Sequence, residues 1–273
     1  MTFVAVTVLA CTTQKAPPPE DTAAPPVPPD LTWPSPNVVF NPPEIVVPED
    51  FGTHKVFLSA GHGTGTNVGN IGCRCQLEQD FTLRATHQLA DQLKSLGVFK
   101  VSEARTGAKR PTYGARLRKL HRSKAEVMVE LHSDYRGSPF VMAGVHESGE
   151  WCMKSSRAPG LAVLVSDEGS ETLAAERRRL ARAVARALWD AGFTYFDGYQ
   201  YGDSYDGDEE VGGVYLDRRG LMMLRRPKVP SILIETHNAV DPNEVSRWDE
   251  PATQDMFFRA VTKGLVNYFA ASN

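Results

Sequence analysis

The stretch KVFLSAGHGTGTNVGNIGCRCQLEQDFTLRATHQLADQL, residues 55–93, contains the first strand and the first helix of the predicted fold. Residues 55–59 form a short apolar run that is typical of a buried strand. From Glu78 onward apolar residues recur at helical spacing, and Gly97 marks the end of that helix. A glycine-rich loop that contains His62 joins the two. Because glycine is costly in conformational entropy, such a loop indicates that its backbone holds something or lets something approach closely.

The same alternation of strand and helix continues through the chain. Strands are predicted at 99–104, 126–131, 161–167 and 231–235, and helices at 111–123, 170–192 and 253–272. The segments 136–160 and 197–217 are predicted to be long loops. Strands that alternate with helices favour a single α/β domain. We therefore expect a mostly parallel mixed sheet of about six strands with helices on both faces.

Composition limits the class of protein. The chain has 273 residues, of which 41% are hydrophobic, and this is enough for one sizeable core. The net charge is −3, from 30 basic and 33 acidic residues, and the basic residues are scattered among the acidic ones. Nucleic acid is therefore not an expected partner.

The N-terminus predicts export from the cytoplasm. Residues 3–10 are apolar, but they are far fewer than the roughly 20 residues that span a bilayer as a helix. They are typical of the core of a signal peptide. The ending VLAC resembles a bacterial lipobox, so residues 1–11 are predicted to be a signal peptide with Cys11 as the lipidated residue. The alternatives are secretion without an anchor and an N-terminus that is not processed.

The signal peptide is followed by a proline-rich segment. Residues 12–50 contain 12 of the 19 prolines and a single basic residue, Lys15. Such a segment buries little apolar area, so we expect a disordered spacer between a membrane anchor and a catalytic domain at 51–273. A lipid on Cys11 would place the protein in the bacterial cell envelope, on the periplasmic side. The residue after Cys11 is Thr12 and not an aspartate. In this respect the chain resembles lipoproteins that are sorted to the outer membrane.

Three cysteines remain if Cys11 carries a lipid: Cys73, Cys75 and Cys152. Disulfides form in exported proteins, and Cys73 and Cys75 are too close in sequence for an unstrained mutual bridge. Cys152 is therefore predicted to pair with one of these two. The alternative is a Cys-x-Cys metal site, although the second half of its thiolate ligands is missing.

Two histidines and two glutamates form the candidate site. His62, His132 and Glu235 lie at or just past the ends of predicted strands, where functional groups gather in open α/β sheets. With Glu78 they match a hydrolytic zinc site, which needs three protein ligands and an open position for water. Three of these four residues would be the metal ligands, and the remaining carboxylate would take the proton of the attacking water and later return it. Glu130 is an alternative base or a support of His132, because strand alternation places both on one face.

Each residue alone has an ordinary explanation. A histidine at the end of a strand is more often a packed or surface residue than a ligand. Glu78 is a favourable acid in the first turn of a helix.

The order and surroundings of these residues resemble the zinc-dependent N-acetylmuramoyl-L-alanine amidases of bacteria. The resemblance rests on four segments in the family's order: VFLSAGHG (56–63), LEQDFTL (77–83), RLRKLHRSKAEVMVELHSD (116–134) and LMMLRRPKVPSILIETHNAVDPNE (221–244). Arg116 and Arg225 fall on arginines of the family pattern. Gln79 and Glu130 depart from it, since they replace a lysine and a serine.

The resemblance implies that His62, Glu78 and His132 bind Zn²⁺ and that Glu235 is the catalytic carboxylate. It also implies hydrolysis of the amide bond between N-acetylmuramic acid and L-alanine in peptidoglycan. The alternatives are a zinc hydrolase of another amide and a cell-wall-binding lipoprotein without turnover. Whether an activator protein is needed stays open.

Three further residues are candidates for substrate binding. Arg225 is expected either to orient a substrate carboxylate or to form a structural ion pair. His237 and Asn238 follow Glu235 closely and are expected to line the cleft. The alternatives for His237 are a stabiliser of the transition state and a plain surface loop residue.

Overall fold

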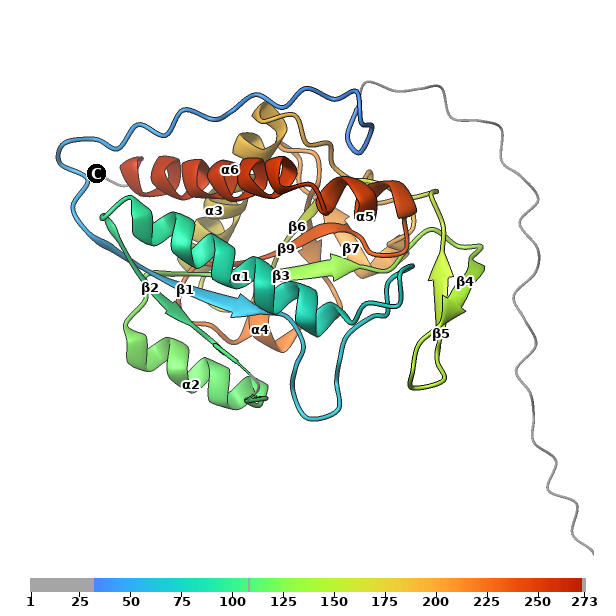
Figure 1. The fold of residues 1–273 in the computed structure, drawn as a ribbon. Coiled ribbons are helices and arrows are strands. Elements are labelled where there is room, and N and C mark those ends of the chain that lie inside the picture. The colour runs from blue at the N-terminus through green and yellow to red at the C-terminus, as the bar shows by residue number, and fades with distance from the viewer. Residues whose placement is uncertain (1–31, 108, 272–273) are drawn as a thin grey trace, which may run out of the picture.

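The computed structural model describes residues 32–107 and 109–271, and a seven-stranded sheet forms its centre (Figure 1). The strand order is β2-β1-β3-β9-β6-β8-β7. Its strands are β1 (His54–Ala60), β2 (Phe99–Glu103), β3 (Val127–Asp134), β6 (Ala162–Val165), β7 (Tyr205–Gly207), β8 (Val214–Asp217) and β9 (Ser231–Asn238). The helices are α1 (Glu78–Ser95), α2 (Tyr113–Ser123), α3 (Glu171–Asp190), α4 (Met222–Arg225), α5 (Pro242–Trp248) and α6 (Pro251–Ala270), with a 3-10 turn at Gly202–Ser204.

The predicted fold class is confirmed, since this is one α/β domain with a mostly parallel mixed sheet. β1 pairs in parallel with β2 and β3, β3 with β9, and β6 with β8. β6 runs antiparallel to β9, and β7 antiparallel to β8. The sheet exceeds the expected six strands because the predicted loop 197–217 contributes β7 and β8.

Strand alternation divides the sheet into two faces. Val129 and Leu131 of β3 belong to the main core, with residues of α1, α3 and α6. Met128 packs on the other face, with residues of α2 and α4. Because side chains alternate along a strand, Glu130 and His132 share the face of Met128. Figure 1 shows α2 and α4 on this side of the sheet, opposite α1 and α6.

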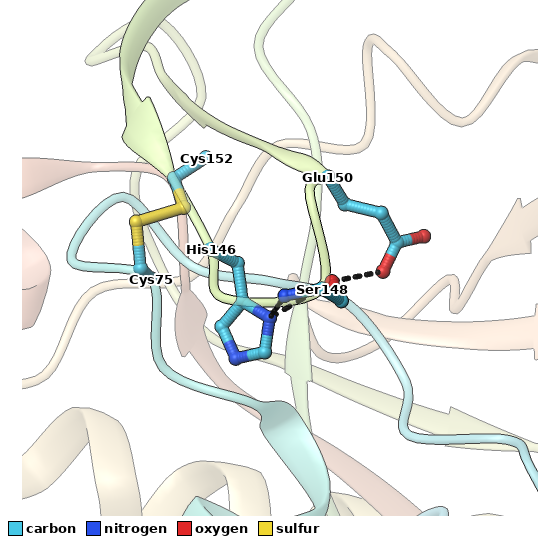
Figure 2. The surroundings of a disulfide bond; sticks show 5 residues. All are labelled: Cys75, His146, Ser148, Glu150 and Cys152. Carbon is cyan, nitrogen blue, oxygen red and sulfur yellow. Dashed lines mark hydrogen bonds between the residues drawn. A yellow bond between two sulfur atoms is a disulfide. The ribbon is translucent and has the colours of Figure 1, made fainter.

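A separate hairpin stands beside the sheet. β4 (Val141–Val145) and β5 (Trp151–Lys154) pair antiparallel within the segment 136–160, which was predicted to be a loop. A disulfide joins Cys75 to Cys152 and so ties the hairpin to the loop that precedes α1 (Figure 2). Cys73 is free. Since the bridge spans 77 residues of chain, it restricts the unfolded state and stabilises the fold.

The turn of the hairpin is held by its own side chains. Ser148 Oγ lies 2.9 Å from His146 Nδ1 and donates to Glu150 Oε2 at 3.1 Å (Figure 2). These bonds are local to the turn, whereas the disulfide is a cross-link from the hairpin to the loop before α1.

The described part of the proline-rich segment differs from the predicted disordered spacer. Residues 32–50 contain neither helix nor strand, but they run along α6 (Figure 1). Trp33 is 1% exposed, and its Nε1 donates to Glu244 Oε1 at 2.9 Å. Its ring lies 5.0 Å from that of Phe193. A few aromatic side chains suffice to anchor a chain otherwise rich in proline.

Replacing Trp33 with alanine is expected to lower the free energy of unfolding by about 3–5 kcal/mol, because a large buried side chain is lost and Glu244 loses one of its hydrogen-bond donors. Urea denaturation measures the change. Val39→Ala is the matched control, because Val39 is in the same segment but 85% exposed. Equal stability of the two variants would show that this segment does not belong to the folded domain.

Two N-terminal predictions concern residues outside the described part of the chain: the signal peptide 1–11 with Cys11, and the first half of the spacer. Within the described residues, no helix is both long enough and apolar enough to cross a membrane.

Candidate metal centre

Three side chains from distant parts of the chain meet above the carboxyl end of β3. His62 follows β1, Glu78 begins α1 and His132 lies in β3. One ligand atom from each can be chosen so that all three lie within 4.8 Å of one another. Glu78 joins the two histidines, since its Oε2 lies 3.1 Å from His62 Nε2 and its Oε1 lies 2.9 Å from His132 Nδ1.

The glycines of the loop make this meeting possible. A Cβ atom at Gly61 would lie 2.6 Å from His132 Nε2. At Gly69, where φ is +83°, it would collide with Glu78 Oε2 and lie 2.7 Å from His62 Cδ2. The loop is therefore rich in glycine partly because its backbone passes directly against the cluster.

A buried arginine fixes the start of the loop. Arg116 of α2 is fully buried, and its Nη1 donates to the carbonyl of Ala60 at 2.6 Å. Its Nη2 donates to the carbonyl of His62 and to Thr64 Oγ1. A buried guanidinium is tolerated because these acceptors satisfy it. Arg116 thus fixes the backbone of the residues that lead to and include His62.

Asparagines in the loop orient the cluster. Asn67 Oδ1 lies 2.8 Å from His62 Nδ1, so the proton of this imidazole is held there and Nε2 faces Glu78. The backbone N–H and the Nδ2 of Asn70 both donate to Glu78 Oε2 at 2.9 Å. The sequence analysis missed Asn67 and Asn70, because asparagine is also an ordinary loop residue and nothing in its spacing marks it as a partner.

The electrostatics of the cluster favour a cation. Burial opposes ionisation of Glu78, but hydrogen bonds from His132 and His62 outweigh it and hold the pKa of Glu78 well below its usual value. Burial also opposes protonation of His132, but Glu130 and Glu78 outweigh it and raise the pKa of His132 well above its usual value. Two imidazoles and a carboxylate are a donor set of hydrolytic zinc sites. The three residues can each offer one ligand atom to such an ion.

Glu235 lies next to the cluster without being bonded to it. It is the register partner of His132 across β3 and β9, and it is 6% exposed. Its Oε2 has no hydrogen-bond partner among the described atoms. Burial, assisted by the charge of Asp134 and opposed by that of His132, raises the pKa of Glu235 to about 8. A carboxyl group with such a pKa can accept and return a proton near neutral pH.

Glu130 lies deeper in the sheet than Glu235. Its Oε1 accepts from Ser59 Oγ at 3.0 Å and lies 3.9 Å from His132 Nε2. Arg116 Nη1 lies 4.0 Å from the same oxygen. Glu130 thus contacts the ring of His132 from inside the sheet. At 1% exposure it is less accessible to a substrate than Glu235.

The predicted substrate contacts differ from what the structure shows. Arg225 Nε forms an ion pair with Glu168 Oε1 at 3.0 Å, which agrees with the structural alternative. Asn238 is fully buried, and its Nδ2 donates to the carbonyl of Arg136 at 3.0 Å. The sequence suggested a cleft residue because Asn238 follows Glu235 so closely, but β9 continues through Asn238 and keeps it inside.

His237 is not a surface loop residue, and it lines a cavity together with Glu78, as the sequence analysis expected. It is 5% exposed, and its ring stacks on Trp248 with 5.3 Å between centroids and 14° between planes. Burial, assisted by the charge of Arg136, lowers the pKa of His237 to about 3. The side chain is therefore a neutral, packed imidazole next to the metal centre.

Replacing Gly69 with alanine is expected to weaken zinc binding roughly tenfold or more, because the new methyl group displaces Glu78 and His62. Competition with a chromophoric chelator measures the affinity. Gly65→Ala is the matched control: its φ is also positive, at +55°, but a Cβ there would have nothing within 4 Å. Equal affinities of the two variants would contradict the collision.

Comparison with known proteins places this geometry in context. The sequence model of the family described as Amidase_3, N-acetylmuramoyl-L-alanine amidase, matches residues 56–267. No curated protein matches the chain.

Several solved structures share the fold. Ami1, an N-acetylmuramyl-L-alanine amidase of Mycobacterium smegmatis, is 18% identical with a TM-score of 0.63, over 81% of this chain and 99% of that one. The N-acetylmuramoyl-L-alanine amidase of Clostridium difficile 630 is 17% identical with a TM-score of 0.62, over 81% and 100%. AmiC2 of Nostoc punctiforme is 19% identical with a TM-score of 0.58, over 80% and 98%. At such identities the likeness shows the fold.

Proposed function

The chain belongs to the Amidase_3 family of N-acetylmuramoyl-L-alanine amidases, and on that premise we propose that it is a zinc-dependent amidase that cleaves the bond between N-acetylmuramic acid and L-alanine in peptidoglycan. The observation that carries the proposal is the meeting of His62, Glu78 and His132 with Glu235 in register beside them. A packed core alone would not require this arrangement of two imidazoles and two carboxyl groups.

The proposed roles follow from the surroundings of each residue. His62, Glu78 and His132 would hold the zinc ion, with Asn67 and Asn70 fixing the first two. A bound zinc ion supplies Lewis acidity that polarises a carbonyl group and acidifies water. Glu235 would take a proton from the attacking water and deliver it to the leaving nitrogen of L-alanine. One C–N bond breaks, one C–O bond forms, and Glu235 ends in its starting state.

We also propose a location for this activity. Cys11, which lies outside the described residues, would carry a lipid after removal of the signal peptide. The residues between it and Trp33 would span the gap between the membrane and the domain. This arrangement gives an envelope lipoprotein on the periplasmic side, facing peptidoglycan, and Thr12 favours the outer membrane. The support for it is the lipobox-like ending VLAC.

Digestion of purified sacculi tests the proposed reaction. The zinc-loaded protein is expected to release free stem peptides and to leave the glycan strands intact, whereas Glu235→Gln releases none. If the native protein hydrolyses other amides but releases no stem peptide, the substrate is wrong. Sedimentation with sacculi without any hydrolysis would indicate a binding protein that keeps the fold.

A further inference from the structure

A cavity beside the candidate metal centre lies on the same face of the sheet as Glu235. It has a volume of about 340 Å³, and its lining includes Asp134, Tyr135, Phe140, Tyr201, Tyr205 and Arg219. Tyr201 and Tyr205 pack against a small apolar cluster that contains Leu233. Leu233 and Glu235 share one face of β9 because side chains alternate along a strand. The cavity and the proposed proton carrier therefore lie on one side of the sheet.

The distance between them suits a short piece of peptide. In the strand order, β6 is the one strand between β9, which carries Glu235, and β8, which leads to Arg219. Two strand spacings amount to about 10 Å. An extended peptide covers such a distance in about three residues. The charge of Glu235 also reaches the cavity: burial is the main cause that raises the pKa of Tyr205, and Glu235 adds to it.

Two arginines line the cavity, and they differ in how far their guanidinium groups are engaged by the protein. Arg136 is buried, and each of its nitrogens already donates: Nε to the carbonyl of Ala158 at 2.7 Å, Nη1 to Asp134 Oδ2 at 2.6 Å and Nη2 to the carbonyl of Gly160. Its guanidinium is held by the wall of the cavity and is 3% exposed, so it is less open to a ligand than Arg219.

The guanidinium of Arg219, which lines the cavity, is hydrogen-bonded through Nε, and its two terminal nitrogens have no partner among the described residues. Its Nε donates to Asp217 Oδ1 at 3.0 Å, and the second oxygen of Asp217 accepts the backbone N–H of Leu221 at 2.9 Å. Its Cζ lies 4.5 Å from the centre of the Tyr205 ring. Over residues 32–107 and 109–271, neither terminal nitrogen of Arg219 has a hydrogen-bond partner, and the side chain is 43% exposed. The guanidinium is thus oriented in advance, with two terminal nitrogens available.

We propose that Arg219 binds a free carboxylate of the peptide stem in this cavity and so selects acidic stems over amidated ones. The inference rests on the proposed function, because the stem extends from the amide at which Glu235 acts. A guanidinium offers two parallel donors that match a carboxylate. The aromatic rings beside it would pack against the aliphatic part of the same residue. Arg219 would then have the role that the sequence suggested for Arg225.

The test is the binding of released stem peptide, which the enzyme cannot cleave further, to the zinc-loaded protein by calorimetry. Two peptides are compared, one with its free carboxylates and one with these carboxylates converted to amides. The native protein is expected to bind the acidic peptide about ten- to hundredfold more tightly. Arg219→Gln removes this preference, and Arg219→Lys keeps the charge but loses part of the preference.

Arg218→Gln is the matched control. Arg218 is the neighbouring residue, it pairs with Asp206 and Asp167, and it does not line the cavity. This variant should keep the native preference, and all variants should keep the native zinc content and melting temperature.

The outcomes separate the two proposals. Equal binding of both peptides by the native protein, or an unchanged preference in Arg219→Gln, overturns the carboxylate site. If Arg219→Gln bound a peptide-free glycan fragment more weakly than the native protein does, but bound the stem peptide equally well, the carboxylate site would also be overturned and a sugar site indicated. Hydrolysis of sacculi is measured separately, and its absence overturns the proposed function whatever the peptide preference.

Discussion

Replacing Glu235 with glutamine is expected to lower kcat for stem-peptide release by about 10²- to 10⁴-fold, the usual contribution of a general acid–base residue. Glutamine keeps the shape of the side chain but cannot take a proton from water. The amide also fits the site, because Oε2 of Glu235 has no partner among the described atoms whose loss would destabilise the fold. The zinc content and melting temperature should therefore stay at their native values.

The matched control for this experiment is Glu244→Gln. Glu244 is also fully buried, and burial raises its pKa to about 8 as well. It differs in its partners, since it accepts hydrogen bonds from Trp33 Nε1 and from the backbone N–H of Gly160. Its replacement should lower the melting temperature and leave kcat per folded molecule unchanged. If Glu235→Gln behaved like this control, Glu235 would be a structural acid and another base would have to be sought.

The fold was largely predictable because most of its long elements have strong periodic patterns. The predicted helix at 170–192 corresponds to α3 and the one at 253–272 to α6, each within a few residues. α5 was missed, although Asp241 and Pro242 are a recognisable start signal and Asp241 does accept the backbone N–H of Asn243. β7 and β4, of three and five residues, were assigned to loops because neither segment shows a clear alternation of apolar and polar residues.

The direction of β6 could not be predicted from its residues. Ala162–Val165 is buried throughout, and an apolar run reads the same whichever way the strand points. The direction is set by the connection, because the β4–β5 hairpin lies between β3 and β6 in the chain. A pattern within one strand carries no information about such a path.

The candidate site was predictable in its main residues and not in its support. His62, Glu78 and His132 were identified because strands and helices of this kind bring loop residues to one edge of a sheet. The roles of Asn67, Asn70 and Arg219 depend on side-chain rotamers and on loops that pack far from their sequence neighbours. For Arg225 the sequence left a ligand contact and a structural ion pair open, and the structure pairs it with Glu168.

Replacing Glu78 with glutamine is expected to abolish stoichiometric zinc binding and with it at least as much activity as the loss of Glu235. The carboxylate is the one charged group shared by His62 and His132, with Oε2 at 3.1 Å and Oε1 at 2.9 Å from their nitrogens. An amide is a far weaker metal ligand, and its NH₂ group would face one of the imidazoles. Metal analysis after dialysis against a weak chelator measures the occupancy.

The effect should also be visible in stability. Zinc that binds only the folded protein raises the melting temperature of the native chain by mass action. Glu78→Gln should lose this zinc-dependent increase, and the native protein should lose it on treatment with a strong chelator. Glu103→Gln is the matched control, because Glu103 also pairs with a histidine, His87, but lies at the end of β2 outside the cluster. It should retain both zinc and the increase. If Glu78→Gln retained them too, the metal would have to be bound elsewhere, and the proposed centre would be a buried network of ion pairs that stabilises the loop rather than a site of hydrolysis.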